Sequence, residues 1–314
     1  MSTQKLRIIF MGTPDFAATT LQALIEGPDE VVAVVTQPDK ARGRGKKLSP
    51  PPTKVIAEAA GIPVLQPTKI KTEEFRNGLI TYQPDLFVVA AYGRILPPSI
   101  LDLAPMGCIN VHGSLLPKYR GAAPIQWAVI NRDPEVGVTI IQMNKGMDTG
   151  DILLKSSIEP AKDETAGSLF IKLAELGSET LLKAVEGLKK GTVIPIPQEH
   201  ELATNAPMFT KNDGCISWVK DAGELEGLIR GLDPWPSAFC FLNGKRLRLF
   251  NPEVVHKDSD LAPGAVIQAD KRGILVSCGT NCLLIREIQP EGKKRMSVEA
   301  FLCGCELAPG TEFS

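Results

Sequence analysis

Uninterrupted apolar runs alternate with segments of helical periodicity through the first 190 residues. The runs at 6–11, 31–36 and 85–92 (LRIIFM, VVAVVT and DLFVVAAY) carry apolar side chains at most positions. Such strands must be covered on both faces, which is typical of a parallel sheet between two layers of helices. The same patterns predict further strands at 62–65, 107–111, 136–143 and 152–158, and helices near 16–25, 53–60, 71–82, 123–132 and 165–189. We therefore expect an α/β fold, doubly wound with a mostly parallel sheet, over residues 1–190.

The pattern changes after residue 190. Residues 191–208 contain three prolines and no clean periodicity, which predicts a linker. From residue 209 to residue 314, short apolar stretches separated by turns predict an all-β domain, most simply a small OB-like β-barrel. The expected strands there lie at 215–219, 239–242, 246–250, 264–269, 273–278 and 281–288.

Charge and cysteine usage narrow the class of protein. The net charge of −1 over 314 residues means that a polyanion could bind only at local clusters of cations. No apolar run is long enough to span a membrane, and the first residues lack a signal-peptide core, so we expect a bacterial cytoplasmic protein. The seven cysteines are expected to be reduced thiols. Zinc on Cys278, Cys282, Cys303 and Cys305 is the alternative, but the close Cys pairs of zinc knuckles are missing, so we expect no metal.

Five polar, glycine-bearing segments follow the expected strands. Ligands of doubly wound folds bind beyond the carboxyl ends of the strands, where all five segments would converge. None of them carries the G-x-G-x-x-G, P-loop or G-x-S-x-G pattern, which argues against a dinucleotide site, a P-loop nucleotide site and a serine hydrolase. The segments are 12–16, 37–48, 90–97, 110–121 and 144–152.

Three side chains in these segments suit acyl transfer to an amine. Asn110 and His112 lie two residues apart at a strand end, so their side chains can project the same way. Asp148, in a glycine-flanked loop after the next strand, could reach His112. A carboxamide can donate to a developing oxyanion, an imidazole can stabilise that charge or move a proton, and a carboxylate can fix the tautomer. The alternative is an ordinary strand-end histidine beside an aspartate that only stabilises a turn.

The chain resembles the methionyl-tRNA formyltransferases along nearly its whole length. The core NVHGSLLP with a later Asp is shared by folate-dependent formyltransferases in general, whereas the basic loop after the second strand and the carboxyl-terminal domain are typical of the tRNA enzymes. The motifs that carry the resemblance are MGTPDFA, QPDKARGRGKKL, VVAAYGRILP, NVHGSLLPKYRGAAPIQ, GMDTGDIL, LATNAP, DPWPSAF and IQPEGKKRMSVEAFLCG.

This resemblance implies a formyltransferase-like Rossmann fold and transfer of a formyl group from 10-formyltetrahydrofolate to the α-amine of initiator methionyl-tRNA. The product would be N-formylmethionyl-tRNA for translation initiation. The catalytic residues would be Asn110, His112 and Asp148, in a monomer that needs no metal. The folate would be held largely by backbone groups, with Tyr92 either packing or stacking, in a pocket formed by Ala91, Tyr92, Gly93, Ile95, Leu96, Pro97, Ser114, Leu115, Leu116 and Pro117.

Residues 37–54 hold six cations against one acid and show neither a helical nor a strand period, so a mobile loop is expected. We expect this loop to clamp the tRNA acceptor end, because it leaves the same edge of the sheet as Asn110 and His112; the alternative is a solvated insertion with no function. By the resemblance, the domain 209–314 also binds tRNA. Where relatives often read ATYAPK, this chain has Asn205 and Met208, so Lys211 is the expected replacement for a lysine contact. The expected tRNA-binding residues are Lys40, Arg42, Arg44, Lys46, Lys47 and Lys211.

Two other functions remain open from the residues alone. The same catalytic trio could formylate a nucleotide-sugar amine or a purine precursor, or transfer the formyl group to water. Alternatively, the chain could be a nucleic-acid-binding module with a degenerate enzyme domain. The basic loop and the carboxyl-terminal domain disfavour the first function, and the intact trio disfavours the second.

Overall fold

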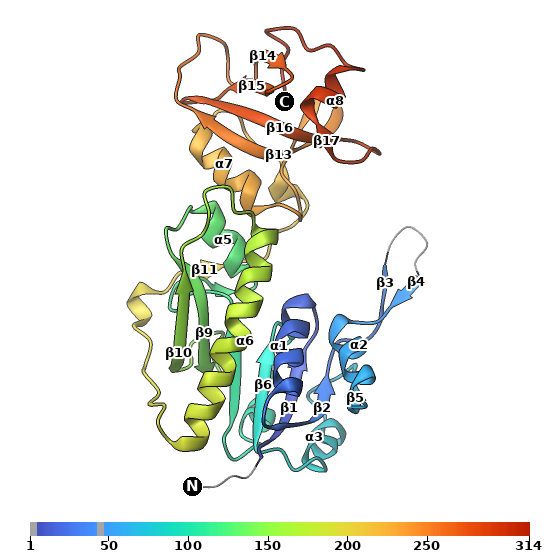
Figure 1. Cartoon of the computed structure of the whole chain (residues 1–314), viewed down its shortest axis with the longest axis vertical. Helices are drawn as coiled ribbons and strands as arrows, with labels where there is room; N and C mark the ends of the chain where they lie inside the picture. Colours follow the sequence, from blue (N-terminus) through green and yellow to red (C-terminus); the bar gives the residue numbers. More distant parts are fainter. Residues whose placement is uncertain (1–4, 43–46) are drawn as a thin grey trace. The chain divides into compact units, whose positions relative to one another are not determined.

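A seven-stranded sheet forms the first of two units in the computed structural model, which describes residues 5–42 and 47–314 (Figure 1). The first unit comprises Met1–Pro124, Glu135–Glu159 and Phe170–Ala206. The second comprises Ile125–Pro134, Pro160–Leu169 and Pro207–Ser314. Each unit is therefore assembled from discontinuous pieces of chain, and residues 191–206, expected to be a linker, belong to the first unit.

The sheet of the first unit is mixed and predominantly parallel, as the apolar runs predict. Five strands run parallel, β9 is antiparallel to β7, and β10 is antiparallel to β9. Their order across the sheet is β10-β9-β7-β6-β1-β2-β5. The strands are β1 (Arg7–Gly12), β2 (Glu30–Val35), β5 (Val64–Leu65), β6 (Leu86–Ala90), β7 (Cys108–His112), β9 (Val136–Gln142) and β10 (Ile152–Ile158).

Helices cover this sheet on both faces. Gly177 of α6 lies so close to Val111 and Val138 that a methyl group there would contact both side chains, so α6 packs tightly over β7 and β9. On the same side Phe16 of α1 meets Phe170 of α6 edge to face, with ring centroids 5.4 Å apart. The helices of this unit are α1 (Asp15–Glu26), α2 (Pro52–Ala59), α3 (Glu73–Ile80), α4 (Pro98–Leu101) and most of α6 (Ala166–Lys190), whereas α5 (Pro124–Ile130) belongs almost wholly to the second unit.

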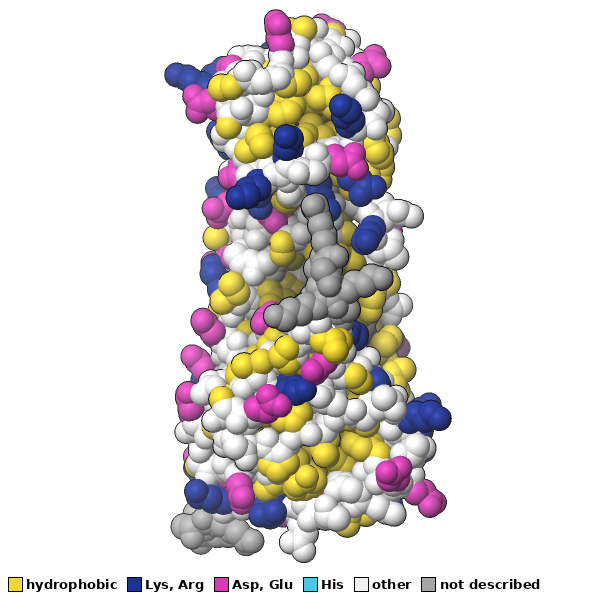
Figure 2. Space-filling model, turned by 90° about the vertical axis from the view of Figure 1, so that its right-hand side faces the viewer, with side chains coloured by type: hydrophobic (Ala, Val, Ile, Leu, Met, Phe, Trp, Pro, Cys, Tyr) yellow, Lys and Arg dark blue, Asp and Glu magenta, His cyan; other side chains and the backbone are white. Residues whose placement is uncertain are grey.

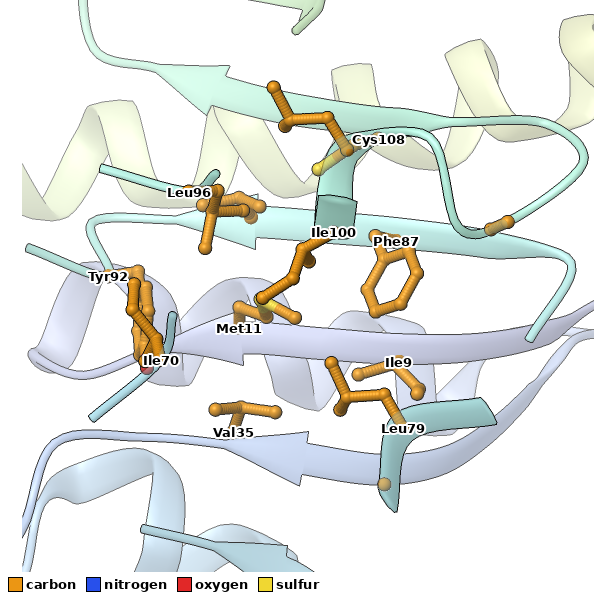
Figure 3. Packing of buried hydrophobic residues seen from close by; sticks show 14 of the residues in the cluster. Ile9, Met11, Val35, Ile70, Leu79, Phe87, Tyr92, Leu96, Ile100 and Cys108 are labelled. Atoms are coloured by element: carbon orange, nitrogen blue, oxygen red, sulfur yellow. The ribbon is translucent and has the colours of Figure 1, made fainter. Parts of the chain in front are cut away.

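The opposite face of the sheet buries a second apolar layer (Figure 3). Because side chains alternate along a strand, Ile9 and Met11 of β1 face this layer together with Phe87 and Val89 of β6. Leu79 of α3 and helix α4 close the layer from outside. The labelled members in Figure 3 are Ile9, Met11, Val35, Ile70, Leu79, Phe87, Tyr92, Leu96, Ile100 and Cys108.

Two short pairs of strands lie outside the main sheet. Strands β3 (Lys40–Arg42) and β4 (Lys47–Ser49) pair antiparallel, so the expectation of no strand within residues 37–54 is wrong. The base of this hairpin is fixed because Lys54 Nζ donates to both carboxylate oxygens of Asp39 at 3.0 Å. Strands β8 (Arg120–Gly121) and β11 (Asn205–Ala206) pair parallel.

The second unit contains an antiparallel sheet, in the order β12-β13-β16-β15-β14, with β17 beside β16. No closed barrel is detected among these strands of the described chain, but the last residues bond to both edges. The backbone of Ser314 exchanges two hydrogen bonds with Phe241 of β12, and Val266 N–H of β14 donates to the carbonyl oxygen of Thr311 at 2.8 Å. The strands are β12 (Phe239–Leu242), β13 (Lys245–Val255), β14 (Val266–Asp270), β15 (Gly273–Ser277), β16 (Cys282–Pro290) and β17 (Met296–Ser297).

Two features of the second unit differ from the sequence prediction. The strand expected at 215–219 is wrong, because Cys215 makes only one isolated bridge, to Phe239. Helix α7 (Ala222–Gly231) was not predicted, since three of its ten residues after the cap are glycines. Those glycines permit close packing: a methyl group on Gly227 would lie 2.5 Å from the carbonyl oxygen of Ile130.

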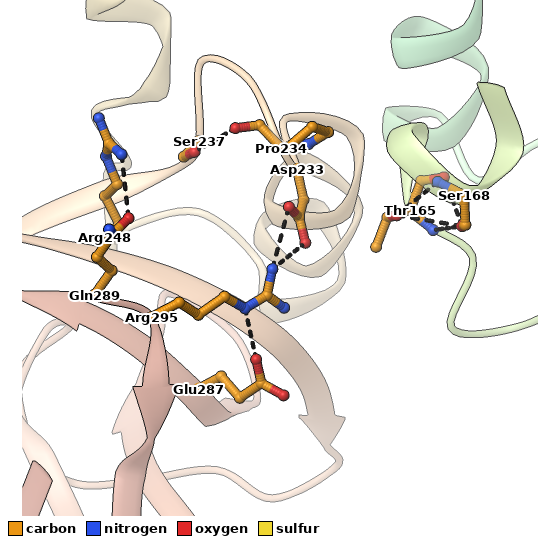
Figure 4. Close-up of polar contacts among 9 residues, drawn as sticks. All are labelled: Thr165, Ser168, Asp233, Pro234, Ser237, Arg248, Glu287, Gln289 and Arg295. Carbon is orange, nitrogen blue, oxygen red and sulfur yellow. Dashed lines mark hydrogen bonds and ion pairs between the residues drawn. The ribbon is translucent and has the colours of Figure 1, made fainter. Parts of the chain in front are cut away.

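Polar contacts join the elements of the second unit (Figure 4). Arg295 Nη1 donates to Asp233 at 3.0 Å, and its Nε donates to Glu287 of β16 at 2.6 Å. The same guanidinium lies over the ring of Phe250, 4.1 Å from its centroid. A short helix, α8 (Val298–Leu302), follows β17, and Ser297 Oγ caps it by accepting from Ala300 N–H. No helix in the described residues is long and apolar enough to cross a membrane.

The core layer of Figure 3 predicts a large effect of truncating Phe87, whose side chain is fully buried. We expect Phe87→Ala to lower the free energy of unfolding of the first unit by about 3–5 kcal/mol, because it removes a buried ring and leaves a cavity. Denaturant unfolding followed by circular dichroism measures this change.

Gly78→Ala in α3 is the matched control, because a Cβ there would meet no atom within 4 Å. It should raise stability by roughly 0.5–1 kcal/mol through helix propensity. A Phe87→Ala protein as stable as the wild type would contradict this description of the core.

Candidate active site

Two polar side chains interrupt the apolar face of β7 at its carboxyl end. Cys108 faces the core layer of Figure 3, and Asn110 and His112 follow it at intervals of two, on the same face. Val111, between them, faces α6 on the other side. Asn110 is 9% exposed and His112 is 6% exposed, so both are nearly buried at the edge of the sheet. Strand alternation thus brings the predicted amide and imidazole together.

The hydrogen bonds of His112 fix its tautomer. Its Nε2 lies 2.9 Å from the carbonyl oxygen of Tyr119. Because a carbonyl can only accept, Nε2 must carry a hydrogen. Its Nδ1 lies 3.7 Å from Asp148 Oδ1. In the neutral ring, the nitrogen that faces the carboxylate therefore carries no hydrogen.

Asp148 comes to His112 from a strained turn after β9. Its backbone φ is +54°, a left-handed conformation that is uncommon for residues other than glycine. The side chain is held because Oδ2 accepts a hydrogen bond from Gly121 N–H at 2.8 Å. Gly150 allows the chain to return to the sheet, since a methyl group there would lie 1.7 Å from the carbonyl oxygen of Gln142. The loop thus presents one carboxylate oxygen to His112 and commits the other to the backbone.

The segment 90–97 presents backbone and few side chains. Ala91 and Gly93 have positive φ values, +44° and +78°, and both residues are exposed. Tyr92 is buried in the core layer of Figure 3, and this burial raises the pKa of its hydroxyl. Of the two roles considered for Tyr92, its position in this layer favours packing. Leu96 is also buried, whereas Ile95 is 76% exposed.

Buried groups hold the segment 114–117 in place. Thr139 Oγ1 donates to the carbonyl oxygen of Ser114 at 2.7 Å and accepts from Leu116 N–H at 3.1 Å. Lys155 Nζ donates to the carbonyl oxygen of Leu116, and burial lowers the pKa of this amine. The side chains of Ser114 and Leu116 are buried, and Leu115 and Pro117 are half-buried. Thr139 was missed by the sequence analysis, because a threonine within a strand carries no functional signal.

The residues predicted to bind tRNA are distributed over both units. Lys40 is exposed on β3, and Arg42 and Lys47 belong to the β3–β4 hairpin. Arg44 and Lys46 lie outside the described residues. Lys211 is exposed just before a short 3-10 helix in the second unit.

Several arginines of the second unit contact other residues of the same unit. Arg272 pairs with Asp270 at 2.8 Å, and Arg248 donates to Gln289 at 3.1 Å. Arg246 lies over the ring of Phe239. On the face drawn in Figure 2, Lys and Arg side chains are interspersed with Asp and Glu, so no large area carries a single sign of charge.

Cavity size does not locate the site. A cavity of about 760 Å³ in the first unit lies between α6 and the residues that precede β2, at the amino ends of the parallel strands. A cavity of about 520 Å³ in the second unit is lined by charged residues that include Arg230, Arg286 and Arg295. In doubly wound folds the ligand lies at the carboxyl ends, so the residues around His112 identify the site better than volume does.

All seven cysteines are free thiols. In the described part of the chain, no group of three or more His, Cys, Asp or Glu side chains is placed to hold a metal ion.

Comparison with known proteins assigns both halves of the chain to families. The formyl transferase family matches residues 5–185, and the formyl transferase carboxyl-terminal domain family matches residues 208–306. A methionyl-tRNA formyltransferase of Desulfotalea psychrophila is 68% identical over 98% of this chain and 95% of its own length. Those of Acetivibrio thermocellus and Geobacter metallireducens are 48% and 50% identical, each over 97% of this chain and over 98% and 97% of their own lengths.

Solved structures support the same fold at much lower identity. WlaRD, a sugar 3N-formyl transferase crystallised with dTDP and 5-N-formyl-THF, has a TM-score of 0.67 and 16% identity over 93% of this chain and 100% of its own. HypX from Aquifex aeolicus in complex with tetrahydrofolic acid has a TM-score of 0.63 and 16% identity, covering 95% of this chain and 47% of its own.

Proposed function

We propose that the cluster of Asn110, His112 and Asp148 at the end of β7 is the active site of a methionyl-tRNA formyltransferase. The chain belongs to this family. The reaction transfers a formyl group from 10-formyltetrahydrofolate to the α-amino group of methionyl-tRNA. The product, N-formylmethionyl-tRNA, serves translation initiation. The observation that carries the assignment of the site is the pairing of His112 Nδ1 with Asp148 at 3.7 Å.

In the proposed mechanism the neutral α-amine attacks the formyl carbon and a tetrahedral oxyanion forms. The carboxamide N–H of Asn110 donates to that oxyanion. Nε2 of His112 is bonded to the carbonyl oxygen of Tyr119, so only Nδ1 can hold or move a proton at the reacting atoms. The carboxylate of Asp148 stabilises the ring when Nδ1 is protonated and thereby assists proton transfer from the amine to the departing folate nitrogen.

The proposed folate pocket uses the two loops beside this cluster. The positive φ values at Ala91 and Gly93 turn the backbone of an exposed loop, so its N–H and C=O groups can pair with the edge of a pterin. The exposed side chain of Ile95 offers apolar contact. The half-buried Leu115 and Pro117 line the other side, while Leu96, Ser114 and Leu116 support the pocket from within the fold.

The proposed tRNA contacts divide between the hairpin and the second unit. Lys40, Arg42, Arg44, Lys46 and Lys47 supply cations on one short segment, and Lys211 supplies one at the start of the second unit. We assign catalysis to residues 1–190, the connection to 191–208 and tRNA binding to 209–314. The bonds from the last residues to both edge strands favour a small OB-like β-barrel in the second unit. We further propose a monomer that acts in the bacterial cytoplasm, as expected for relatives of bacterial origin.

The identity of the acceptor is the first test. Purified protein with radiolabelled 10-formyltetrahydrofolate should label methionyl-tRNA and leave N-acetylmethionyl-tRNA unlabelled, because a blocked amine cannot attack. Nucleotide-sugar amines and purine precursors should receive no label. If free formate were released with N-acetylmethionyl-tRNA as fast as the formyl group is consumed with methionyl-tRNA, the protein would instead be a hydrolase.

The catalytic trio is the second test. We expect Asn110→Ala, His112→Ala and Asp148→Asn each to lower kcat on the order of 100-fold or more, because each side chain acts mainly in the transition state. Single-turnover formylation of methionyl-tRNA measures the effect. His256→Ala is the control, since His256 is exposed in the second unit. A folded His112→Ala protein with normal turnover would refute the mechanism.

The basic hairpin is the third test. Changing both Arg42 and Arg44 to Ala should raise KM for methionyl-tRNA and flatten its dependence on salt, because fewer phosphates are neutralised. Folate binding, measured by calorimetry, should stay unchanged. The control removes two cations from α6, with Lys183→Ala and Lys190→Ala, and should leave the salt dependence intact. Loss of folate affinity with normal use of tRNA would contradict the assignment.

A further inference from the structure

A segment after α6, residues 198–206, lies against residues 119–122. Within that loop, Tyr119 bonds to His112 and Gly121 bonds to Asp148. Arg120 N–H donates to the carbonyl oxygen of Thr204 at 2.8 Å, and Ala122 N–H donates to that of Ala206 at 3.0 Å. Gly121 is in such close contact that a methyl group there would lie 2.7 Å from the carbonyl oxygen of Ala206. The sequence predicts a linker here, yet the chain forms a parallel bridge of two strands.

Gln198 makes four side-chain hydrogen bonds from this segment to the loops beside it. It is 5% exposed, and its Nε2 donates to the carbonyl oxygens of Asp148, at 2.8 Å, and Gly150, at 2.7 Å. Its Oε1 accepts from Nη2 of Arg120 at 2.6 Å and from Nε at 3.2 Å. Both hydrogens and the oxygen of the amide are therefore used. Only a carboxamide provides two donors and one acceptor in this arrangement.

Thr204 bonds to the backbone of Tyr119, the residue that contacts His112. Its Oγ1 accepts a hydrogen bond from Tyr119 N–H at 2.9 Å. Tyr119 has a backbone φ of +64°, and its carbonyl oxygen is the group that binds Nε2 of His112. The bond from Thr204 thus holds the backbone of Tyr119, the residue whose carbonyl oxygen binds the ring of His112.

We propose that residues 198–206 position the catalytic pair, with Gln198 as the positioning residue for Asp148 and Thr204 as the positioning residue for His112. This inference rests on the proposed function of the trio. Asp148 has a left-handed backbone that persists only when its surroundings hold it, and Gln198 supplies two bonds across that turn. A displacement of about 1 Å at a reacting group can cost on the order of 100-fold in rate.

The decisive variant is Gln198→Met, which keeps the length of the side chain and removes both polar atoms of the amide, Oε1 and Nε2. We expect kcat to fall at least about 10-fold, with KM for formyl-folate and for methionyl-tRNA within about 2-fold of the wild type, because ground-state binding is built by other loops. Thr204→Val, which removes the acceptor for Tyr119 N–H, should lower kcat in the same way. It also serves as the second variant if Gln198→Met does not fold.

Two further measurements distinguish a positioning role of Gln198 from a role in stability alone. Ser178→Ala removes a buried hydrogen bond of 2.7 Å within α6, so it matches the loss of a buried polar contact without touching the loop. It should leave kcat unchanged at a comparable shift in Tm. In an Asp148→Asn background, Gln198→Met should lower kcat less than 2-fold further, because residues that act as one unit are not additive.

The outcomes separate this inference from the proposed function. An active Asp148→Asn protein would refute the catalytic role of the carboxylate itself. An impaired Asp148→Asn protein together with normal kcat in both Gln198→Met and Thr204→Val would overturn only the positioning role. Full additivity of Gln198→Met with Asp148→Asn, or a rise in KM with unchanged kcat, would overturn it as well.

Discussion

The bond between Nε2 of His112 and the carbonyl oxygen of Tyr119 is the interaction on which the rest of the site depends. A backbone carbonyl cannot donate, so this bond assigns the hydrogen of the imidazole and leaves Nδ1 for chemistry. The carbonyl can occupy that place only because Tyr119 adopts a left-handed backbone, which Thr204 holds from the other side. A conformation that is costly locally is thus maintained by a contact 85 residues away in sequence.

The sheet explains why this arrangement occurs at one end of β7 only. Ile109 and Val111 on one face and Cys108 on the other are buried between helices, where an unpaired polar side chain would be costly. Asn110 and His112 stand at the carboxyl end of the strand, where loops replace the helices, and they retain 9% and 6% exposure there. The strained turn of Asp148 then returns the chain to the sheet beside them.

Local periodicity was sufficient to predict the sheet of the first unit, and the order of strands and loops predicted that Asp148 can reach His112. It failed where tertiary contacts override propensity. Helix α7 forms despite its glycines because they pack against Ile130, and the β3–β4 hairpin forms within a segment that has no apolar period. Gln198 gave no signal at all, because a single glutamine in a proline-containing stretch is ordinary until its partners are known.

The loops at the carboxyl edge are also joined to one another by side-chain amides. Gln37 Nε2 donates to the carbonyl oxygen of Tyr92 at 3.1 Å, and Gln66 Nε2 donates to that of Gln37 at 2.9 Å. Gln66 also bonds Asp39 at the base of the hairpin, and this bond, with a further one from Lys54, lowers the pKa of the Asp39 carboxyl. Gln37 therefore links the turn at Tyr92 to the base of the hairpin through two hydrogen bonds. Gln198 likewise bonds to both Arg120 and the turn of Asp148, so side-chain amides link neighbouring loops in two places at this edge of the sheet.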